Sequence, residues 1–508
     1  MVNVQVPARG GLVRTSRWIM SVLLLLGGLA AAPPAAAAAT PPISWRPCPQ
    51  DQAVECGSLS VPVGWADPHG PRIEIAVARR KAADPARRVG SLVFNLGGPG
   101  ISGVRATLDA AEIFSADLLE RFDLVGFDPR GVPGSTPVLC PAGVSNMPDN
   151  PATAEEYDRM RARLNAYDKE CRRLSGPVFD HADTLSAARD VDALRAALGE
   201  RTISLYTLSY GTLLGQQYAE LFPHRLRALV LEGNLDHSLR RPADFLTARA
   251  RTSERALRMF ADWCRGPGSG CALGGQDPAE VLDGLMARAE RGELPDPDFP
   301  GFPMTPEWLA GRVEFHVADQ SLWPRSDDYL ITLRDQAAPR AGREASPSEP
   351  PEAWEDPYAA IFCADFRWPV RDFGELARLR EAVRKAAPTV RWTFTGWRDV
   401  AGCQGRDIAT RNPQRPYRFR HDTPPVLLVN SRHDVATPYE FAAAVSRRIH
   451  RSVLLAYEGV GHWTYHASPC ARGTIDRYLL TLALPRPGAS CPAMPVTPAA
   501  ASPVPATG

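Results

Sequence analysis

Residues 203–212 read Ile-Ser-Leu-Tyr-Thr-Leu-Ser-Tyr-Gly-Thr, a short apolar run that reaches Ser209 and leaves through Gly211. The run predicts a buried strand, and the residues after Gly211 predict a helix that ends at Phe222, before Pro223. A serine at so sharp a strand-to-helix turn has a strained backbone, which lifts its hydroxyl clear of the sheet. The stretch therefore predicts a nucleophile elbow at Ser209.

The elbow departs from the usual pattern G-x-S-x-G at one of its two glycines. Thr207 stands two residues before the serine, whereas Gly211 keeps the second small position. Threonine is small, so we expect it to fit if the helix lies slightly farther from the strand.

A serine hydroxyl becomes a good nucleophile when a histidine takes its proton and a carboxylate orients that histidine. Residues 425–430 read as a buried parallel strand, and Asp434 lies on the loop after it. The next strand, 452–457, is followed by His462. The order serine, acid, histidine is that of α/β-hydrolases, so we predict a catalytic triad of Ser209, Asp434 and His462.

Three other residues compete for these roles. Asp422 precedes its strand and is badly placed for the acid, although Asp434 could also be an ordinary turn aspartate. His433 and His466 are the alternatives to His462, which is favoured by its place just after a strand.

The reaction also needs two backbone N–H groups that bind the developing oxyanion. Residues 91–95 read as a strand, and the glycine-rich turn 96–100, Leu-Gly-Gly-Pro-Gly, follows it. We assign one donor to the amide of Tyr210 and the other to Gly98, with Gly97 as the alternative.

These segments together resemble a known family. The stretches 95–103 (Asn-Leu-Gly-Gly-Pro-Gly-Ile-Ser-Gly), 128–131 (Asp-Pro-Arg-Gly) and 208–212, with the Asp434 and His462 segments, are similar to the secreted tripeptidyl aminopeptidases, which are α/β-hydrolases related to proline iminopeptidases. The resemblance extends over nearly the whole chain after the N-terminal segment. It implies cleavage of short peptides, tripeptides in this family, from free protein N-termini without a cofactor.

An aminopeptidase must hold the ammonium group of its substrate, and a carboxylate in a partly desolvated pocket would do so. Glu232 and Asp365 are our candidates. Glu232 begins the sequence Glu-Gly-Asn, where the family pattern leads us to expect Asp-Gly, so the departure falls near the expected substrate entrance.

The expected organisation is an α/β fold, a mainly parallel sheet wrapped by helices with an inserted, mostly helical cap. Residues 40–236 form the first part of the core, 237–421 the cap and 422–491 the second part of the core, while 492–508 form a disordered tail. The strand candidates in the first part are 72–79, 91–95, 121–127, 202–207 and 227–231, and 183–198 is an amphipathic helix.

The N-terminus predicts export. Arg9, Arg14 and Arg17 precede an apolar run that continues to Ala32, and an alanine-rich stretch follows up to Ala39. Residues 1–39 therefore read as a secretory signal peptide, with a retained membrane anchor as the alternative. We expect a secreted protein without a stable anchor.

Ten cysteines in an exported chain favour disulfides over free thiols, and they include no Cys-x-x-Cys pair, so we expect no metal site. Neighbouring positions and the family resemblance together suggest five local pairs. They are Cys48 with Cys56, Cys140 with Cys171, Cys264 with Cys271, Cys363 with Cys403, and Cys470 with Cys491.

Composition sets the remaining limits. The 508 residues carry a formal net charge of +1, which gives no reason to expect nucleic acid or an acidic membrane as a partner. An esterase or lipase with the same triad, and a catalytically silent binding protein, remain alternatives. The length of the released peptide and the oligomeric state stay open.

Overall fold

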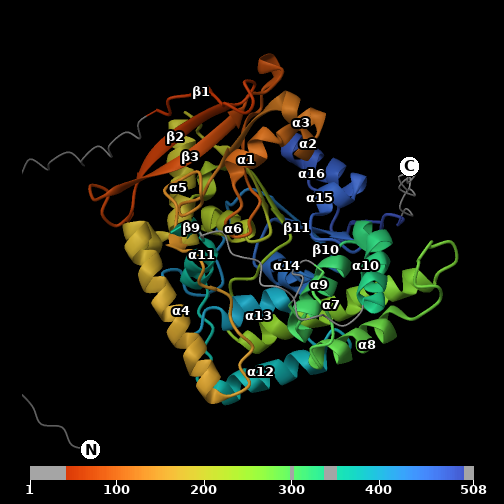
Figure 1. Ribbon diagram of the computed structural model, residues 1–508. Coiled ribbons are helices and arrows are strands. Elements are labelled where there is room, and N and C mark those ends of the chain that lie inside the picture. The colour runs from red at the N-terminus through yellow and green to blue at the C-terminus, as the bar shows by residue number, and fades with distance from the viewer. Residues whose placement is uncertain (1–41, 298–301, 337–351, 497–508) are drawn as a thin grey trace, which may run out of the picture. The chain divides into compact units, whose positions relative to one another are not determined.

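The computed structural model describes residues 42–297, 302–336 and 352–496. Its centre is a ten-stranded sheet (Figure 1). In sheet order the strands are β1 (Arg46–Pro47), β2 (Glu55–Pro62), β3 (Arg72–Arg80), β5 (Phe122–Phe127), β4 (Gly90–Asn95), β7 (Ile203–Leu208), β8 (Leu226–Glu232), β10 (Val426–Ser431), β11 (Ser452–Tyr457) and β12 (Ser490–Cys491).

The sheet is mainly parallel. The pairs from β1 to β5 are antiparallel, and all pairs from β5 across to β12 are parallel. Every residue of β4, β5, β7 and β10 is buried, as expected for strands covered on both faces. The predicted strands agree with the observed ones to within one residue at each end, and the predicted fold class is confirmed.

Helices lie on both faces of the sheet and over its edge. They are α1 (Gly103–Leu108), α2 (Ala110–Ile113), α3 (Ala116–Arg121), α4 (Ala154–Ser175), α5 (Thr184–Ala197), α6 (Gly211–Leu221), α7 (Pro242–Arg265), α8 (Pro278–Glu290), α9 (Pro306–Val317), α10 (Trp323–Asp335), α11 (Tyr358–Asp365), α12 (Phe373–Ala386), α13 (Phe394–Ala401), α14 (Tyr439–Ser446), α15 (Thr464–Ala467) and α16 (Pro469–Thr481). Short 3₁₀ turns cover Pro85–Arg87, Gly176–His181, Pro223–Arg225 and Gln320–Leu322.

The predicted amphipathic helix before the elbow is α5. Its N-cap residue Asp183 accepts a hydrogen bond from the Ser186 N–H at 2.9 Å, which satisfies one of the free donors of the first turn. Ala188, Val191 and Leu194 are buried, so the apolar spacing read from the sequence faces the core.

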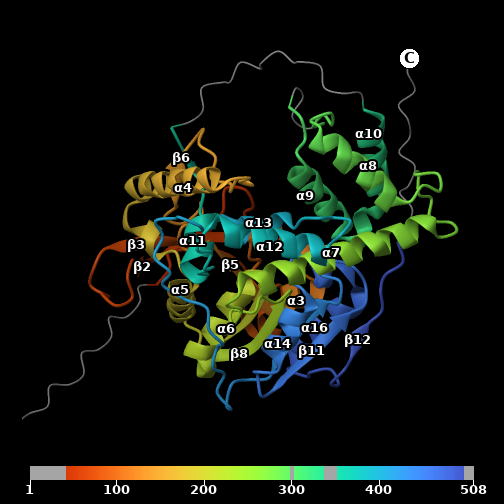
Figure 2. The ribbon, with the colours of Figure 1, turned by 90° about the horizontal axis from the view of Figure 1, so that it is seen from below.

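The chain between β8 and β10 is mostly helical, and we call residues 237–421 the cap segment. In Figure 2, α7 to α13 and α4 lie on the side of the molecule away from β11 and β12. Two elements from the first part of the chain join this layer: β6 (Leu139–Pro141) pairs with β9 (Ala353–Glu355), and Asp168 of α4 accepts a hydrogen bond from Arg406 at 2.7 Å. The stretch 40–236, which we expected to form the first part of the core, therefore also contributes β6 and α4 to this layer.

All five predicted disulfides are present. They join Cys48 to Cys56, Cys140 to Cys171, Cys264 to Cys271, Cys363 to Cys403 and Cys470 to Cys491. Among the described residues no cysteine is free.

The predicted signal peptide, 1–39, lies outside the described residues, as does most of the predicted tail. In the described part of that tail, Met494 donates a backbone hydrogen bond to the Tyr457 hydroxyl at 3.2 Å, so this part is anchored to the sheet. Within the described ranges no helix is long and apolar enough to cross a membrane. In the same ranges no three His, Cys, Asp or Glu side chains form a group that could hold a metal ion.

Candidate active site

The predicted site residues lie at one edge of the sheet because the strands before them are neighbours in register. Leu208 pairs with Glu232, and Glu232 pairs with Val429 of β10. Strand β10 in turn pairs along its whole length with β11. The loops that follow β7, β10 and β11, which carry Ser209, Asp434 and His462, therefore start side by side.

Ser209 has the strained backbone expected of a nucleophile elbow. Its φ is +59°, in the left-handed region that non-glycine residues rarely adopt. Its N–H donates to the Glu232 carbonyl at 2.8 Å, and its carbonyl accepts from the N–H of Thr212 at 2.9 Å. These bonds hold the turn at both ends, and α6 begins at Gly211.

Thr207 is accommodated by a glycine on the facing helix. The Thr207 hydroxyl donates to the Val230 carbonyl at 3.1 Å, so the side chain is fixed inside the sheet. A Cβ on Gly215 of α6 would lie 2.8 Å from that hydroxyl oxygen, which is too close for an ordinary contact. The space that the motif normally provides at position 207 is therefore provided at position 215.

Asp434 and His462 form a pair in which the His462 side chain is 29% exposed. The Nδ1 of His462 lies 2.8 Å and 3.0 Å from the two carboxylate oxygens of Asp434. The carboxylate also accepts from the N–H groups of Ala436 and Thr437, both at 2.9 Å, and from the Thr437 hydroxyl at 2.7 Å. Asp434 is fully buried, so these donors fix its orientation and that of the imidazole.

His462 lies beside the elbow. A Cβ on Gly233 would be 2.9 Å from the imidazole Cε1, and Gly233 follows Glu232, whose carbonyl bonds to Ser209. Among the hydrogen bonds of the described residues none joins the Ser209 hydroxyl to His462. Such catalytic bonds are often long before a substrate binds.

The electrostatic surroundings favour the protonated imidazole. Burial by itself lowers the pKa of His462, but the Asp434 carboxylate, through its charge and its hydrogen bond, outweighs burial. The charge of Glu232 acts in the same direction, and the net pKa of His462 is raised. This suits a base that must hold a proton during the reaction.

The glycine-rich turn packs directly against the elbow. A Cβ on Gly97 would lie 2.8 Å from the Tyr210 nitrogen, so only glycine allows this approach. The Gly97 N–H donates to the Asn95 side chain at 3.0 Å, whereas no acceptor is found for the Gly98 N–H in the described part of the chain. The geometry therefore favours Gly98 over Gly97 as the second oxyanion donor, beside Tyr210.

Glu232 is not placed to bind a substrate ammonium. It is fully buried, its Oε2 accepts from the Tyr206 hydroxyl at 2.6 Å, and its Oε1 accepts from the Tyr465 N–H at 2.7 Å. Burial raises the pKa of Glu232 to about 7. We correct the prediction: Glu232, at the end of β8, is hydrogen-bonded to β7 and to α15, the short helix after His462.

Asp365 is likewise a structural carboxylate. It is fully buried at the end of α11 and accepts from the Tyr210 hydroxyl at 2.5 Å, the Thr184 N–H at 3.0 Å and the Asn412 side chain at 3.0 Å. Burial raises the pKa of Asp365 to about 7. Protein donors occupy its oxygens, so Asp365 connects the cap segment to Tyr210 rather than contacting substrate.

A pocket of about 370 Å³ opens beside His462. Its wall is mostly apolar and includes Trp308, Phe315 and Phe394, with Phe315 64% exposed. Glu314 of α9 also lines it, and sequence reasoning missed this residue because a single acid on a helix carries no motif. Its carboxylate accepts from the Phe394 N–H at 3.1 Å and the Thr395 hydroxyl at 2.9 Å, at the start of α13.

The competing triad residues lie elsewhere. Asp422 forms an exposed ion pair with Arg420 at 3.0 Å. The ring of His466 packs against Trp463, with centroids 4.1 Å apart. The imidazole of His433 has a buried Nδ1 without a hydrogen bond, so neither rival histidine takes the place of His462 at Asp434.

Two family models match the chain. Residues 90–259 match a model described as alpha/beta hydrolase fold, and residues 391–491 match one described as TAP-like protein. Both matched segments include parts of the site described above.

Curated relatives match over most of their length. The tripeptidyl aminopeptidase of Streptomyces coelicolor is 30% identical over 467 residues, which cover 86% of this chain and 84% of the relative. Serine protease Hip1 of Mycobacterium tuberculosis is 29% identical over 489 residues, 89% of this chain and 91% of the relative. Carboxylesterase B of the same species is 28% identical, covering 89% and 90%.

Among solved structures, the proline iminopeptidase of Mycobacterium smegmatis is 17% identical and covers 83% of this chain and 97% of its own, with a TM-score of 0.33. That score is too low to support the assignment, which depends on the sequence relatives and the sheet topology. The chain belongs to the tripeptidyl aminopeptidase family of α/β-hydrolases and is a serine hydrolase.

Proposed function

We propose that this protein is a secreted serine exopeptidase that releases short peptides, mainly tripeptides, from free N-termini. The observation that carries the proposal is the hydrogen bond from His462 to the buried carboxylate of Asp434, beside the strained elbow of Ser209. The name of the aminopeptidase relatives supports the choice of substrate. The five disulfides are of the kind found in exported proteins, and residues 1–39 are the proposed signal peptide.

The proposed reaction is acyl transfer to water. The Ser209 oxygen attacks the peptide carbonyl while His462 takes its proton, and Asp434 stabilises the imidazolium that forms. The N–H groups of Gly98 and Tyr210 bind the oxyanion. His462 then gives the proton to the leaving amine, and water hydrolyses the acyl-enzyme by the same steps in reverse.

We further propose Glu314 as the group that receives the substrate ammonium, in place of Glu232 and Asp365. Like those two carboxylates, Glu314 is buried and accepts from protein donors. It alone of the three lines the pocket that also contains His462, where an ammonium could use its remaining lone pairs. Burial raises its pKa, and an ammonium ion in the pocket would favour the ionised form. Glu314→Gln removes the charge and keeps one oxygen that can accept from the Phe394 N–H, while its amide N–H₂ can donate to the Thr395 hydroxyl.

Turnover of matched peptides with free and acetylated N-termini tests the exopeptidase. We expect the free peptides to be cleaved at least about tenfold faster, and mass spectrometry of the products to show tripeptides. Glu314→Gln should raise KM for free peptides and leave the acetylated ones unaffected. Equal cleavage of acetylated peptides would remove the exopeptidase proposal.

An esterase is the second candidate, favoured by the apolar wall of the pocket at His462 and by the relative named Carboxylesterase B. Simple esters, assayed beside the peptides, separate the two activities. A silent binding protein is excluded if a fluorophosphonate probe labels the wild type but not Ser209→Ala.

A further inference from the structure

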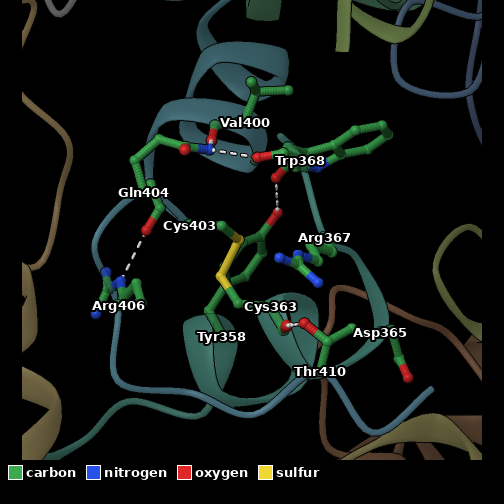
Figure 3. Close-up of a disulfide and its surroundings, with 12 residues drawn as sticks. Tyr358, Cys363, Asp365, Arg367, Trp368, Val400, Cys403, Gln404, Arg406 and Thr410 are labelled. Carbon is green, nitrogen blue, oxygen red and sulfur yellow. Dashed lines mark hydrogen bonds between the residues drawn. A yellow bond between two sulfur atoms is a disulfide. The ribbon is translucent and has the colours of Figure 1, made fainter. Parts of the chain in front are cut away.

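A second cavity, between α11 and α13, has no part in the reaction above. Its volume is about 170 Å³, and its wall includes Tyr358 of α11, Arg398 of α13 and the disulfide between Cys363 and Cys403. Figure 3 shows Tyr358 beside this disulfide, which joins α11 to the chain after α13. The covalent link holds the two sides of the cavity together.

Arg398 places a fixed positive charge in this wall. Its guanidinium lies 3.7 Å from the centroid of the Tyr358 ring, the side chain is 31% exposed, and its buried Nε makes no hydrogen bond. The adjacent carboxylate, Asp399, is 3.9 Å from that Nε. Its oxygens already accept from the Tyr358 hydroxyl at 2.5 Å and from Arg249 at 2.9 Å.

The other two charged residues that line the cavity, Arg406 and Asp356, already have protein partners. Arg406 is paired with Asp168 at 2.7 Å, and both side chains are buried. Asp356 also lines the cavity and accepts from the Tyr167 hydroxyl at 2.7 Å, and no ion pair joins it to Arg398 among the described residues. The negative charge of Asp356 disfavours any anion in the cavity and disfavours a doubly charged one more. The cavity therefore suits a single carboxylate better than a phosphate dianion.

The cavity lies close to the nucleophile. The ring of Phe362 is 5.9 Å from that of Tyr358 and 5.8 Å from that of Tyr210, the residue after Ser209. Three extended residues span about 10 Å, which is comparable to the two ring-to-ring steps that separate Tyr358 from Tyr210.

We propose that Arg398 binds a carboxylate of the peptide substrate, from an acidic side chain or from the C-terminus of a short peptide. A guanidinium forms its strongest hydrogen bonds with planar carboxylates, and one stacked on an aromatic ring is already oriented for them. The proposal rests on the peptidase function above and defines its preferred substrates.

Kinetics with paired peptides test the preference. The two peptides of a pair are identical except that one has Glu and the other Gln at one of the first four positions. In a further pair, one peptide has a free C-terminus and the other an amidated one. We expect kcat/KM at least about tenfold higher for the acid at one position or for the free C-terminus, and a ratio near one in Arg398→Gln. Arg398→Glu should favour Lys over Gln at the same position. The matched control is Arg371→Gln, an arginine that is 77% exposed and should keep the wild-type ratio.

Binding separates failure of this inference from failure of the proposed function. Calorimetry on Ser209→Ala and on the double variant with Arg398→Gln compares the Glu and Gln forms of the same peptides, which no longer need to be cleaved. Circular dichroism checks that each variant is folded. Tighter binding of the acidic form that is lost with Arg398 supports the site. Equal binding of both forms to Ser209→Ala, or a preference that persists without Arg398, overturns it, whether or not the wild type cleaves peptides.

Discussion

The carboxyl edge of the sheet carries Ser209, Asp434 and His462 after strands that pair residue by residue, whereas the cap segment meets that edge with helices joined through side chains. At the edge, backbone register sets the spacing of the reacting groups. In the cap segment, the disulfide between Cys363 and Cys403 and buried groups such as Asp365 set the spacing. In the proposed function, the edge provides the reacting groups and the cap segment contributes the residues that we propose to contact the substrate.

Ser209→Ala should give the largest effect. Removing the nucleophile lowers kcat by about 10⁶-fold in serine proteases, while binding is retained. We expect this loss with a tripeptide p-nitroanilide, with unchanged circular dichroism and little change in peptide affinity. A variant that keeps more than a small fraction of the activity would show that the edge does not provide the nucleophile.

Asp434→Asn should give the second-largest loss of activity. The amide cannot stabilise the imidazolium and favours the wrong tautomer of His462, which costs about 10⁴-fold in kcat in a related triad. The same steady-state assay measures the loss. Asp422→Asn, which changes an exposed acid paired with Arg420, is the matched control and should stay near wild type.

Asp365→Asn tests whether the cap segment also acts on the edge. Asp365 accepts from the hydroxyl of Tyr210, whose N–H is a proposed oxyanion donor, so loosening the contact should lower kcat by roughly tenfold with little change in KM. Tyr210→Phe removes the same bond from the other side. If the two residues act through this contact, the double variant loses no more than either single one. Additive losses, or a change confined to KM, would mean that the two regions act independently.

The pH profile should give the smallest change. His462 must be neutral to act as base, and its pKa is raised from the usual 6.5, so kcat/KM should fall on the acid side from above pH 6.5. In Asp434→Asn the residual activity should show this fall at lower pH, because the main group that raises the pKa is gone. An unchanged profile would show that another group titrates.

The raised pKa of His462 also makes the free energy of unfolding depend on pH, and this dependence has the opposite sign to that of the activity. The raised pKa means that protonated His462 is favoured in the folded state, so its contribution is fully present below pH 6.5 and is lost as pH rises through the raised value. Thermal melting of the wild type and Asp434→Asn across this range measures it.

Sequence reasoning predicted the central strands of the sheet but not β1, β2 or β12, and it placed Ser209, Asp434 and His462 just after three of those strands, because an apolar run and a turn are local patterns. The disulfide pairs depended on neighbouring positions together with the family resemblance. Sequence reasoning failed for Glu232 and Asp365, since a carboxylate in the right neighbourhood can point into the core, and burial depends on contacts such as those with Tyr206 and Tyr210. It also missed α4, whose partners are far along the chain.

The contact between Thr207 and Gly215 shows how the elbow can form although the first glycine of the sequence motif is replaced. The physical constraint at the elbow is the combined volume of the strand and helix positions, which a pattern anchored on the strand alone does not count. An engineer who restores the missing glycine at 207 still cannot place alanine at 215 freely, because a Cβ there would also lie 2.7 Å from Cδ2 of Leu231.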